Sequence, residues 1–303
     1  MTPLSAEILE NWQVRRTKKQ KTAFIQFLQS RLPQLQVESY RRAGSRNLIL
    51  GDLQKAKVVF TAHYDTCAVL PFPNFLTPRN IPVYIIYNIL IIAVFLLLSL
   101  GAGILVERIT GWEDVGHIVY LVVLWVLILL MFCGPANRHN VNDNTSGVIT
   151  LLELYAALSP EAREKCAFVF FDDEENGLLG SARFSKRHKT TMKHKLLINF
   201  DCVSDGDDIL VVAKRAVQKH YDEALRAAFI GSGSKRLRHY PSSTTLYPSD
   251  QAAFPMGVAV AAFRRVPLLG LYISRIHTPR DTVFDERNIR LLTDCSRCLV
   301  DSL

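Results

Sequence analysis

The sequence has little cysteine, and its six cysteines follow no regular spacing. A disulfide framework is therefore not predicted, which is typical of a reducing compartment. Cys295 and Cys298 form a single C-x-x-C, whereas a zinc ribbon needs a second pair. Their three-residue spacing, in a segment with helical apolar periodicity, instead indicates one face of a helix.

A strong excess of one charge is also missing. Lys and Arg total 36 and Asp and Glu total 28, which gives a net charge of +8 over 303 residues. No segment combines basic and aromatic residues as nucleic-acid-binding motifs do, so nucleic acid is not expected as a partner. Hydrophobic residues make up 49% of the chain, which excludes global disorder.

Long hydrophobic runs, in contrast, are present. Val83–Val106 and Val115–Cys133 carry no formal charge, and the polar segment Glu107–Asp114 separates them. About 20 apolar residues are enough for a helix to cross a bilayer. We predict a transmembrane hairpin over 83–133 (helices 83–106 and 115–133) with the lipid bilayer as its partner. The alternative is a pair of buried core helices.

The N-terminus lacks the apolar segment of a signal peptide and becomes strongly basic at Arg15–Lys21. We therefore expect the first 82 residues to stay on the side of synthesis, and a hairpin returns the chain to that side. Arg79 and Arg138 flank the two open ends of the hairpin, whereas Arg108 lies in its turn. Because basic residues are more frequent on the cytoplasmic side, this count weakly favours cytoplasmic open ends. The expectation is an integral membrane protein whose larger domain faces the cytoplasm.

Strand and helix patterns alternate through the rest of the chain. Residues 1–44 predict an N-terminal amphipathic helix, over 8–32, and a connection. Residues 45–82 and 134–303 have the length of one α/β domain into which the hairpin is inserted. Short apolar runs at 58–62, 167–171 and 196–200 predict buried strands, and 148–158 and 286–299 predict helices. We expect a three-layer α/β/α sandwich with a mixed, mainly parallel sheet.

Residues able to bind metal follow three of these strands. His63 and Asp65 follow the first, Asp172–Glu175 the second, and Asp201 the third. Because α/β sheets bind ligands outside the carboxyl ends of their strands, these side chains are candidates for one site.

Each motif has a chemical interpretation and a structural alternative. His63 and Asp65 share one strand face, which suits a metal-bound imidazole oriented by a carboxylate; the alternative is a hydrogen-bonded surface pair. Asp143 precedes a helix, where it could bridge two cations or act as a cap. Of Glu174 and Glu175, one could bind metal while the other accepts a proton from water; the alternative is a solvated acidic loop.

The motifs together resemble a known family. H-Y-D-T, N-D-N-T-S-G, E-E-N-G-L-L-G-S, Asp201 and H-T-P-R-D-T occur in the order of the two-zinc aminopeptidases. The chain is similar, over about residues 45 to 300, to the metallopeptidases that include aminopeptidase Y, bacterial leucyl aminopeptidases and glutamate carboxypeptidase. The resemblance implies a zinc-exopeptidase-like fold and an aminopeptidase acting on a peptide or protein N-terminus, which the predicted hairpin would tether to the membrane.

The resemblance also implies a role for each matching residue. His63 and Asp201 would hold one zinc, Glu175 and His277 a second, and Asp143 would bridge the two. Glu174 would be the general acid/base, and Asp65 would support His63. The cofactor would be two Zn²⁺ per chain, although Co²⁺ or Mn²⁺ also suits carboxylate and imidazole ligands.

Two departures and two alternatives remain open. Ile276 stands where some relatives carry a carbonyl-binding Tyr, and Tyr240 and Tyr247 are the candidates to replace it, between which the sequence does not decide. The hairpin separates His63 from Asp143, so the site should lie near the membrane and its substrates should be membrane-proximal. The alternative functions are a non-catalytic membrane scaffold and a one-zinc transferase resembling glutaminyl cyclases.

Overall fold

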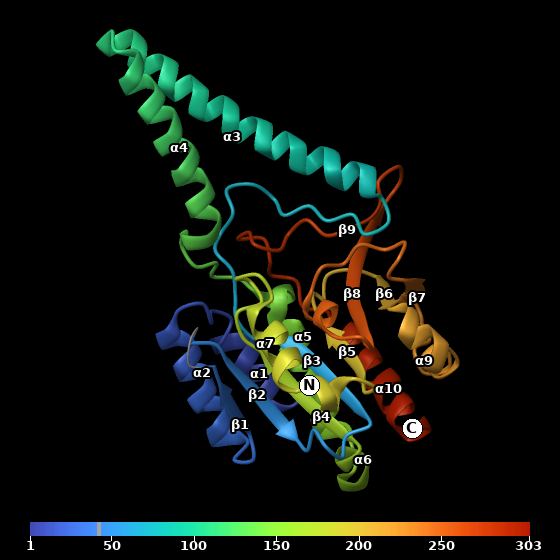
Figure 1. Cartoon of the computed structure of the whole chain (residues 1–303). Coiled ribbons are helices and arrows are strands. Elements are labelled where there is room, and N and C mark those ends of the chain that lie inside the picture. The colour runs from blue at the N-terminus through green and yellow to red at the C-terminus, as the bar shows by residue number, and fades with distance from the viewer. Residues whose placement is uncertain (41–43) are drawn as a thin grey trace.

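A computed structural model describes residues 1–40 and 44–303. One nine-stranded sheet runs through the body of the molecule in the order β1-β2-β4-β3-β5-β8-β6-β7, with β9 paired to β8 (Figure 1). The strands are β1 Gln36–Ser39, β2 Arg46–Gly51, β3 Val58–His63, β4 Cys166–Phe171, β5 Leu196–Phe200, β6 Asp208–Ala213, β7 Arg236–Pro241, β8 Gly257–Val266 and β9 Gly270–Tyr272.

The middle of the sheet is parallel and fully buried. β3 pairs in parallel with β4 and β5, and β5 pairs in parallel with β8. Every residue of β3, β4 and β5 is buried, as expected for strands covered on both faces. The outer contacts β1–β2, β2–β4 and β6–β8 are antiparallel, so the sheet is mixed as predicted.

Helices cover both faces of the sheet. They are α1 Pro3–Asn11, α2 Lys18–Arg31, α5 Ser146–Ala157, α6 Pro160–Glu164, α7 Leu179–Arg187, α8 Lys189–Met192, α9 Arg215–Ala228 and α10 Glu286–Ser302. Side chains of α1, α2, α5, α9 and α10 pack on one face with Phe60, whereas α7 and α8 pack on the other with Val59. This alternation along β3 confirms the three-layer sandwich.

The single N-terminal helix predicted over 8–32 is wrong, because the structure has two helices, α1 and α2. Thr17 begins α2 with a capping box formed with Gln20. The break between the helices allows Arg15 to be fully buried, where its guanidinium donates to the carbonyl oxygen of Tyr64. The connection predicted up to residue 44 includes residues 41–43, which lie outside the described part of the chain.

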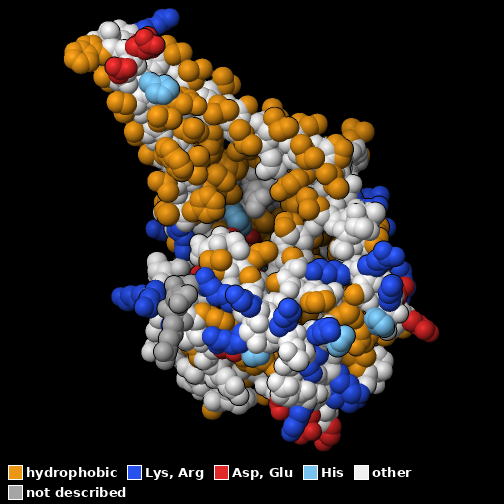
Figure 2. Space-filling model, in the orientation of Figure 1, with side chains coloured by type: hydrophobic (Ala, Val, Ile, Leu, Met, Phe, Trp, Pro, Cys, Tyr) orange, Lys and Arg blue, Asp and Glu red, His pale blue; other side chains and the backbone are white. Residues whose placement is uncertain are grey.

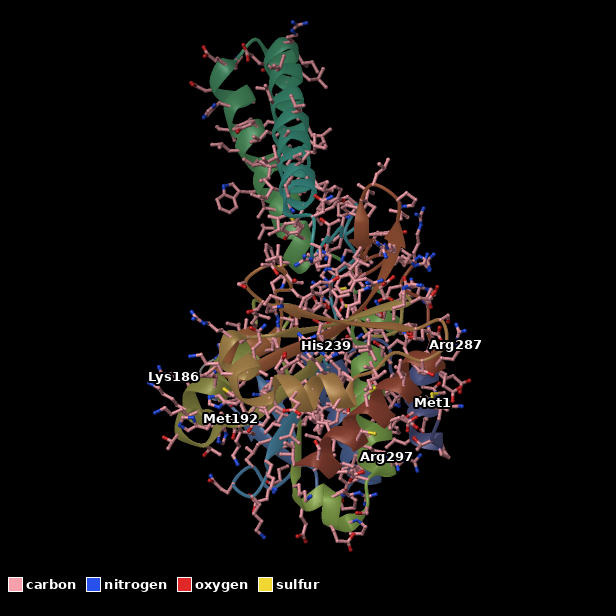
Figure 3. The ribbon with its side chains drawn as sticks, turned by 90° about the vertical axis from the view of Figure 1, so that its right-hand side faces the viewer. Met1, Lys186, Met192, His239, Arg287 and Arg297 are labelled. Carbon is pink, nitrogen blue, oxygen red and sulfur yellow. The ribbon has the colours of Figure 1, made fainter. Side chains whose placement is uncertain are left out.

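The two predicted hydrophobic helices are present and slightly longer than predicted. They are α3 Ile81–Thr110 and α4 Glu113–Cys133, and both are long and apolar enough to cross a membrane. Most of their apolar side chains are exposed, which excludes a pair of buried core helices. The hairpin stands on one end of the body, and the labelled residues in Figure 3 all lie on the body.

The two helices are in close contact near the tip of the hairpin. A Cβ atom added to Gly103 would lie only 2.7 Å from the carbonyl oxygen of Gly116, so the glycines allow the backbones to approach closely. Gly111 ends α3 with a φ of 74°, which favours glycine. From this contact the helices diverge toward the body (Figure 1).

Candidate metal centre

The fold brings the predicted metal-binding residues to one edge of the sheet. His63 is the last residue of β3, Glu174 and Glu175 follow β4, and Asp201 follows β5. Asp143 lies in the segment η1 Val141–Thr145, immediately before α5, and its own backbone is extended, with φ −112° and ψ 94°. The remaining residue, His277, comes from the connection between β9 and α10.

Asp143 lies between the two histidines. Its Oδ1 is 3.2 Å from Nε2 of His63, and its Oδ2 is 3.0 Å from Nε2 of His277. Beyond the histidines, Nε2 of His63 is 3.5 Å from Oδ1 of Asp201, and Nε2 of His277 is 3.2 Å from Oε2 of Glu175. Each oxygen of one carboxylate therefore faces a separate imidazole–carboxylate pair.

Several of these ligand-type atoms are buried without a partner. Nε2 of His63, Oδ1 of Asp201 and Oε1 of Glu175 have no hydrogen-bond partner among the described residues. Buried polar groups are normally hydrogen-bonded, and leaving one unpaired costs free energy. Imidazole and carboxylate atoms that converge in this way fit zinc, which binds both types of ligand.

The charge of the site points the same way. Burial alone would lower the pKa of His63 and of His277, but the surrounding carboxylates raise both well above the ordinary value. Burial is also the largest cause of the strongly raised pKa of Glu174, to which the negative charges of Asp201 and Glu175 add. The site therefore has an excess of negative charge, which bound cations would balance.

Asp65 contacts both sides of the site. Its carboxylate accepts the backbone N–H groups of Glu174 and Glu175, at 3.0 and 3.1 Å. Its Oδ1 also lies 3.6 Å from Nδ1 of His63, and its backbone oxygen lies 3.1 Å from the same nitrogen. Asp65 thus positions the loop that carries the glutamates in addition to lying beside His63.

Two further acidic residues belong to the surroundings of the site. Asp281, the aspartate of the H-T-P-R-D-T motif, accepts the backbone N–H groups of Asn142 and Asp143. Asp250 was not predicted, because nothing in its sequence context marks it. It is fully buried, burial raises its pKa to about 7, and its carboxylate has no hydrogen-bond partner in the described part of the chain.

The proposed substitutes for a carbonyl-binding Tyr do not occupy that position. Tyr247 is buried and donates its hydroxyl to the backbone oxygen of Asp201. The ring of Tyr240 lies under the guanidinium of Arg79, whose Cζ is 4.4 Å from the ring centroid. Cys67, which sequence reasoning did not single out, is buried with its sulfur within 4.8 Å of ligand atoms of Glu175 and His277.

Solved structures share this fold. The chain aligns with the LapA aminopeptidase of Legionella pneumophila at 12% identity and a TM-score of 0.57, over 99% of this chain and 68% of that one. The glutaminyl cyclase of Porphyromonas gingivalis aligns at 15% identity and a TM-score of 0.61, over 99% and 96%. The glutaminyl cyclase of Macrostomum lignano aligns at 13% and 0.57, over 98% and 87%. No curated protein gives a significant sequence match.

The sequence itself identifies the family. The profile of Peptidase family M28 matches residues 131–300, which is more than half of the chain. This match confirms the resemblance stated from the motifs and agrees with the α/β fold shared with the LapA aminopeptidase. The chain therefore belongs to Peptidase family M28.

Proposed function

We propose that the protein is a membrane-tethered aminopeptidase with two zinc ions per chain. The observation that carries the proposal is the position of Asp143, whose two carboxylate oxygens face His63 and His277 separately. His63 and Asp201 would hold one ion, Glu175 and His277 the other, and Asp143 would bridge them. The substrate would be the N-terminus of a peptide or protein.

Glu174 is the proposed general acid/base. Bound zinc supplies Lewis-acid polarisation of the peptide carbonyl and of a water molecule. Glu174 accepts a proton from that water at its carboxylate and later returns a proton to the leaving amine. Asp65 fixes the backbone that carries the side chain of Glu174.

The hairpin is the proposed membrane anchor of the catalytic domain, which comprises residues 45–82 and 134–303. Both helices are long and apolar enough to cross a bilayer, and their side chains form the hydrophobic surface in Figure 2. We expect the catalytic domain to face the cytoplasm. Protease treatment of sealed vesicles tests this orientation, since a protected C-terminus would contradict it.

The decisive experiment replaces Glu174. Glu174→Gln keeps the shape of the side chain but removes its ability to exchange a proton, so turnover of peptide amides should fall by about 10²–10⁴-fold. Zinc content should stay unchanged, because the proposed ligands are intact. Glu164→Gln, on the exposed surface of α6, is the matched control. Full activity of Glu174→Gln would refute the proposed mechanism.

A second candidate is a one-zinc transferase, because glutaminyl cyclases share the fold over nearly the whole chain. The 3.5 Å separation between Nε2 of His63 and Oδ1 of Asp201 supports a second metal position and so favours the peptidase. Elemental analysis of the purified protein separates the two. One zinc per chain would favour the transferase, and none in protein exposed to zinc would favour a scaffold.

A further inference from the structure

A cavity connects the candidate metal centre with the membrane helices. It has a volume of about 590 Å³, which lies within the ~300–1,000 Å³ typical of small-molecule sites. Glu175 and His277 line one end, and Phe75, Tyr87, Asn88 and Phe132 are among the residues that line the rest. Figure 2 shows the molecule hollowed between the two helices and the body, with histidine and acidic side chains visible at the bottom.

The walls of this cavity are held in place by specific contacts. The hydroxyl of Tyr87, on α3, donates to the backbone oxygen of Pro73, and the rings of Tyr87 and Phe75 lie 5.3 Å apart. On the other side, Arg16 donates to the carbonyl oxygens of Phe132 and Gly134, at the end of α4. Both helices are thus fixed to the body where they diverge, and the cavity is a built feature of the fold.

The cavity reaches the level of the apolar helices. Tyr87 and Asn88 lie within the uncharged run Val83–Val106, and Asn88 is about 10 Å along α3 from its first residue. Next to them Ile89 is 58% exposed on the outer surface, and Phe132 on α4 is 61% exposed. A molecule anchored in the bilayer can therefore reach the cavity from the side, between the two helices.

The chemistry of the two ends indicates what would occupy it. Glu175 and His277 line the inner end, so a peptide whose N-terminus enters the cavity brings its free amine to the proposed metal position. Aromatic side chains line the outer part, together with the amides of Asn74 and Asn88. These amides can pair with an extended backbone, whose polar groups need partners in apolar surroundings.

We propose that this cavity binds the N-terminal residues of a membrane-anchored polypeptide, which enter between α3 and α4 with the free amine toward Glu175 and His277. The proposal rests on the proposed aminopeptidase function and names its substrate class. It explains why the chain inserts a hairpin between His63 and Asp143, because the hairpin forms the outer wall of the cavity at the site itself.

The test compares two substrates with the full-length protein in nanodiscs. One is a soluble peptide, and the other carries the same N-terminus ahead of a helix of about 20 apolar residues. Asn88→Trp fills the outer end of the cavity, and Ile89→Trp is the matched control on the lipid-facing side of the same helix. Both variants lie in the same membrane as the anchored substrate. A difference in their turnover of that substrate therefore reports on entry through the cavity and not on co-localisation in the membrane.

We expect Asn88→Trp to lower kcat/KM for the anchored substrate about tenfold or more relative to Ile89→Trp, and to affect the soluble peptide less. Equal values for the two variants would overturn the proposal. A second outcome would also overturn the proposal: lipid binds the wild type stoichiometrically and is lost from Asn88→Trp, while turnover of the anchored substrate stays the same. This result would identify the cavity as a lipid site.

A second measurement does not depend on turnover or on Asn88. A photo-crosslinking p-benzoylphenylalanine placed at Phe132 should capture the N-terminal segment of the anchored peptide in the Glu174→Gln background. The same group at Ile118, exposed near the tip of the hairpin, should not. Crosslinking from Phe132 without turnover by the wild-type protein would contradict the aminopeptidase function alone, whereas equal crosslinking from both positions would contradict the route.

Discussion

The carboxylate of Asp65 accepts the backbone N–H of Glu174 at 3.0 Å, and its second oxygen accepts the N–H of Glu175 at 3.1 Å. Both acceptors are therefore needed to hold the loop after β4. Since Glu174 and Glu175 are the proposed general base and a proposed ligand, Asp65 sets the position of one against the other.

Asp65→Asn should therefore lower kcat by about 10–100-fold, a cost typical of residues that orient the groups of a metal site. The amide offers one acceptor and one donor, so one of the two N–H groups would face a donor. The kinetics should be compared with Asp294→Asn, an exposed substitution on α10, at equal zinc content and equal melting temperature. An unchanged kcat would show that the two hydrogen bonds have no part in catalysis.

Metal content should separate Asp143 from the other proposed ligands. Asp143→Ala removes the only carboxylate among the described residues whose two oxygens face both histidines, so both ions should be lost. Asp201→Ala removes a ligand beside His63 alone and should leave about one ion per chain. Elemental analysis after removal of loosely bound ions measures this. Equal losses from the two variants would argue against a bridging position.

Lys21 should be important for stability. Its Nζ lies 2.6 Å from Oδ1 of Asp172 and 2.7 Å from Oδ1 of Asp173, in a buried cluster directly before the loop that carries Glu174 and Glu175. Lys21→Met leaves these carboxylates without their cation, and breaking such a buried pair costs about 3–5 kcal/mol. We expect a markedly lower melting temperature than for Lys19→Met, an exposed change on the same helix. Equal melting temperatures would refute this role.

The sequence predicted the parts of the site that depend on local pattern. Apolar runs located β3, β4 and β5, and the carboxyl ends of these strands placed His63 and Glu174 near each other, because parallel strands end at one edge. The position of Asp143 between two histidines agrees with the order of the family motifs.

What the sequence could not predict depends on contacts between distant segments. The break in the helix predicted over 8–32 lets the buried Arg15 donate to the carbonyl oxygen of Tyr64, 49 residues away. Asp281 bonds to the backbone of Asp143, 138 residues away. Asp250 is significant only because the fold buries it beside the site. Contacts between residues so far apart in the sequence produce neither a local motif nor a periodic spacing of apolar residues.

The stability of the protein should depend on Asp208 in acid. Asp208 begins β6, and its carboxylate accepts hydrogen bonds from Arg236, at 2.6 and 3.0 Å, and from Arg238, at 2.6 Å. Burial alone would raise the pKa of Asp208, but the two guanidinium groups outweigh it and hold the pKa below its ordinary value. The stabilisation is therefore complete above the unfolded pKa of about 3.9 and is lost as the pH falls through the folded pKa.

Asp208→Asn should accordingly melt below the wild type at neutral pH, and the difference should narrow as the pH falls below about 4, where the wild-type carboxylate becomes protonated. Melting temperatures measured between about pH 7 and pH 3, with Asp294→Asn as the exposed control, test the sign of the effect. A difference that stays constant over this range would mean that Asp208 stabilises the sheet through packing and neutral hydrogen bonds, because only the charged form is lost on acidification.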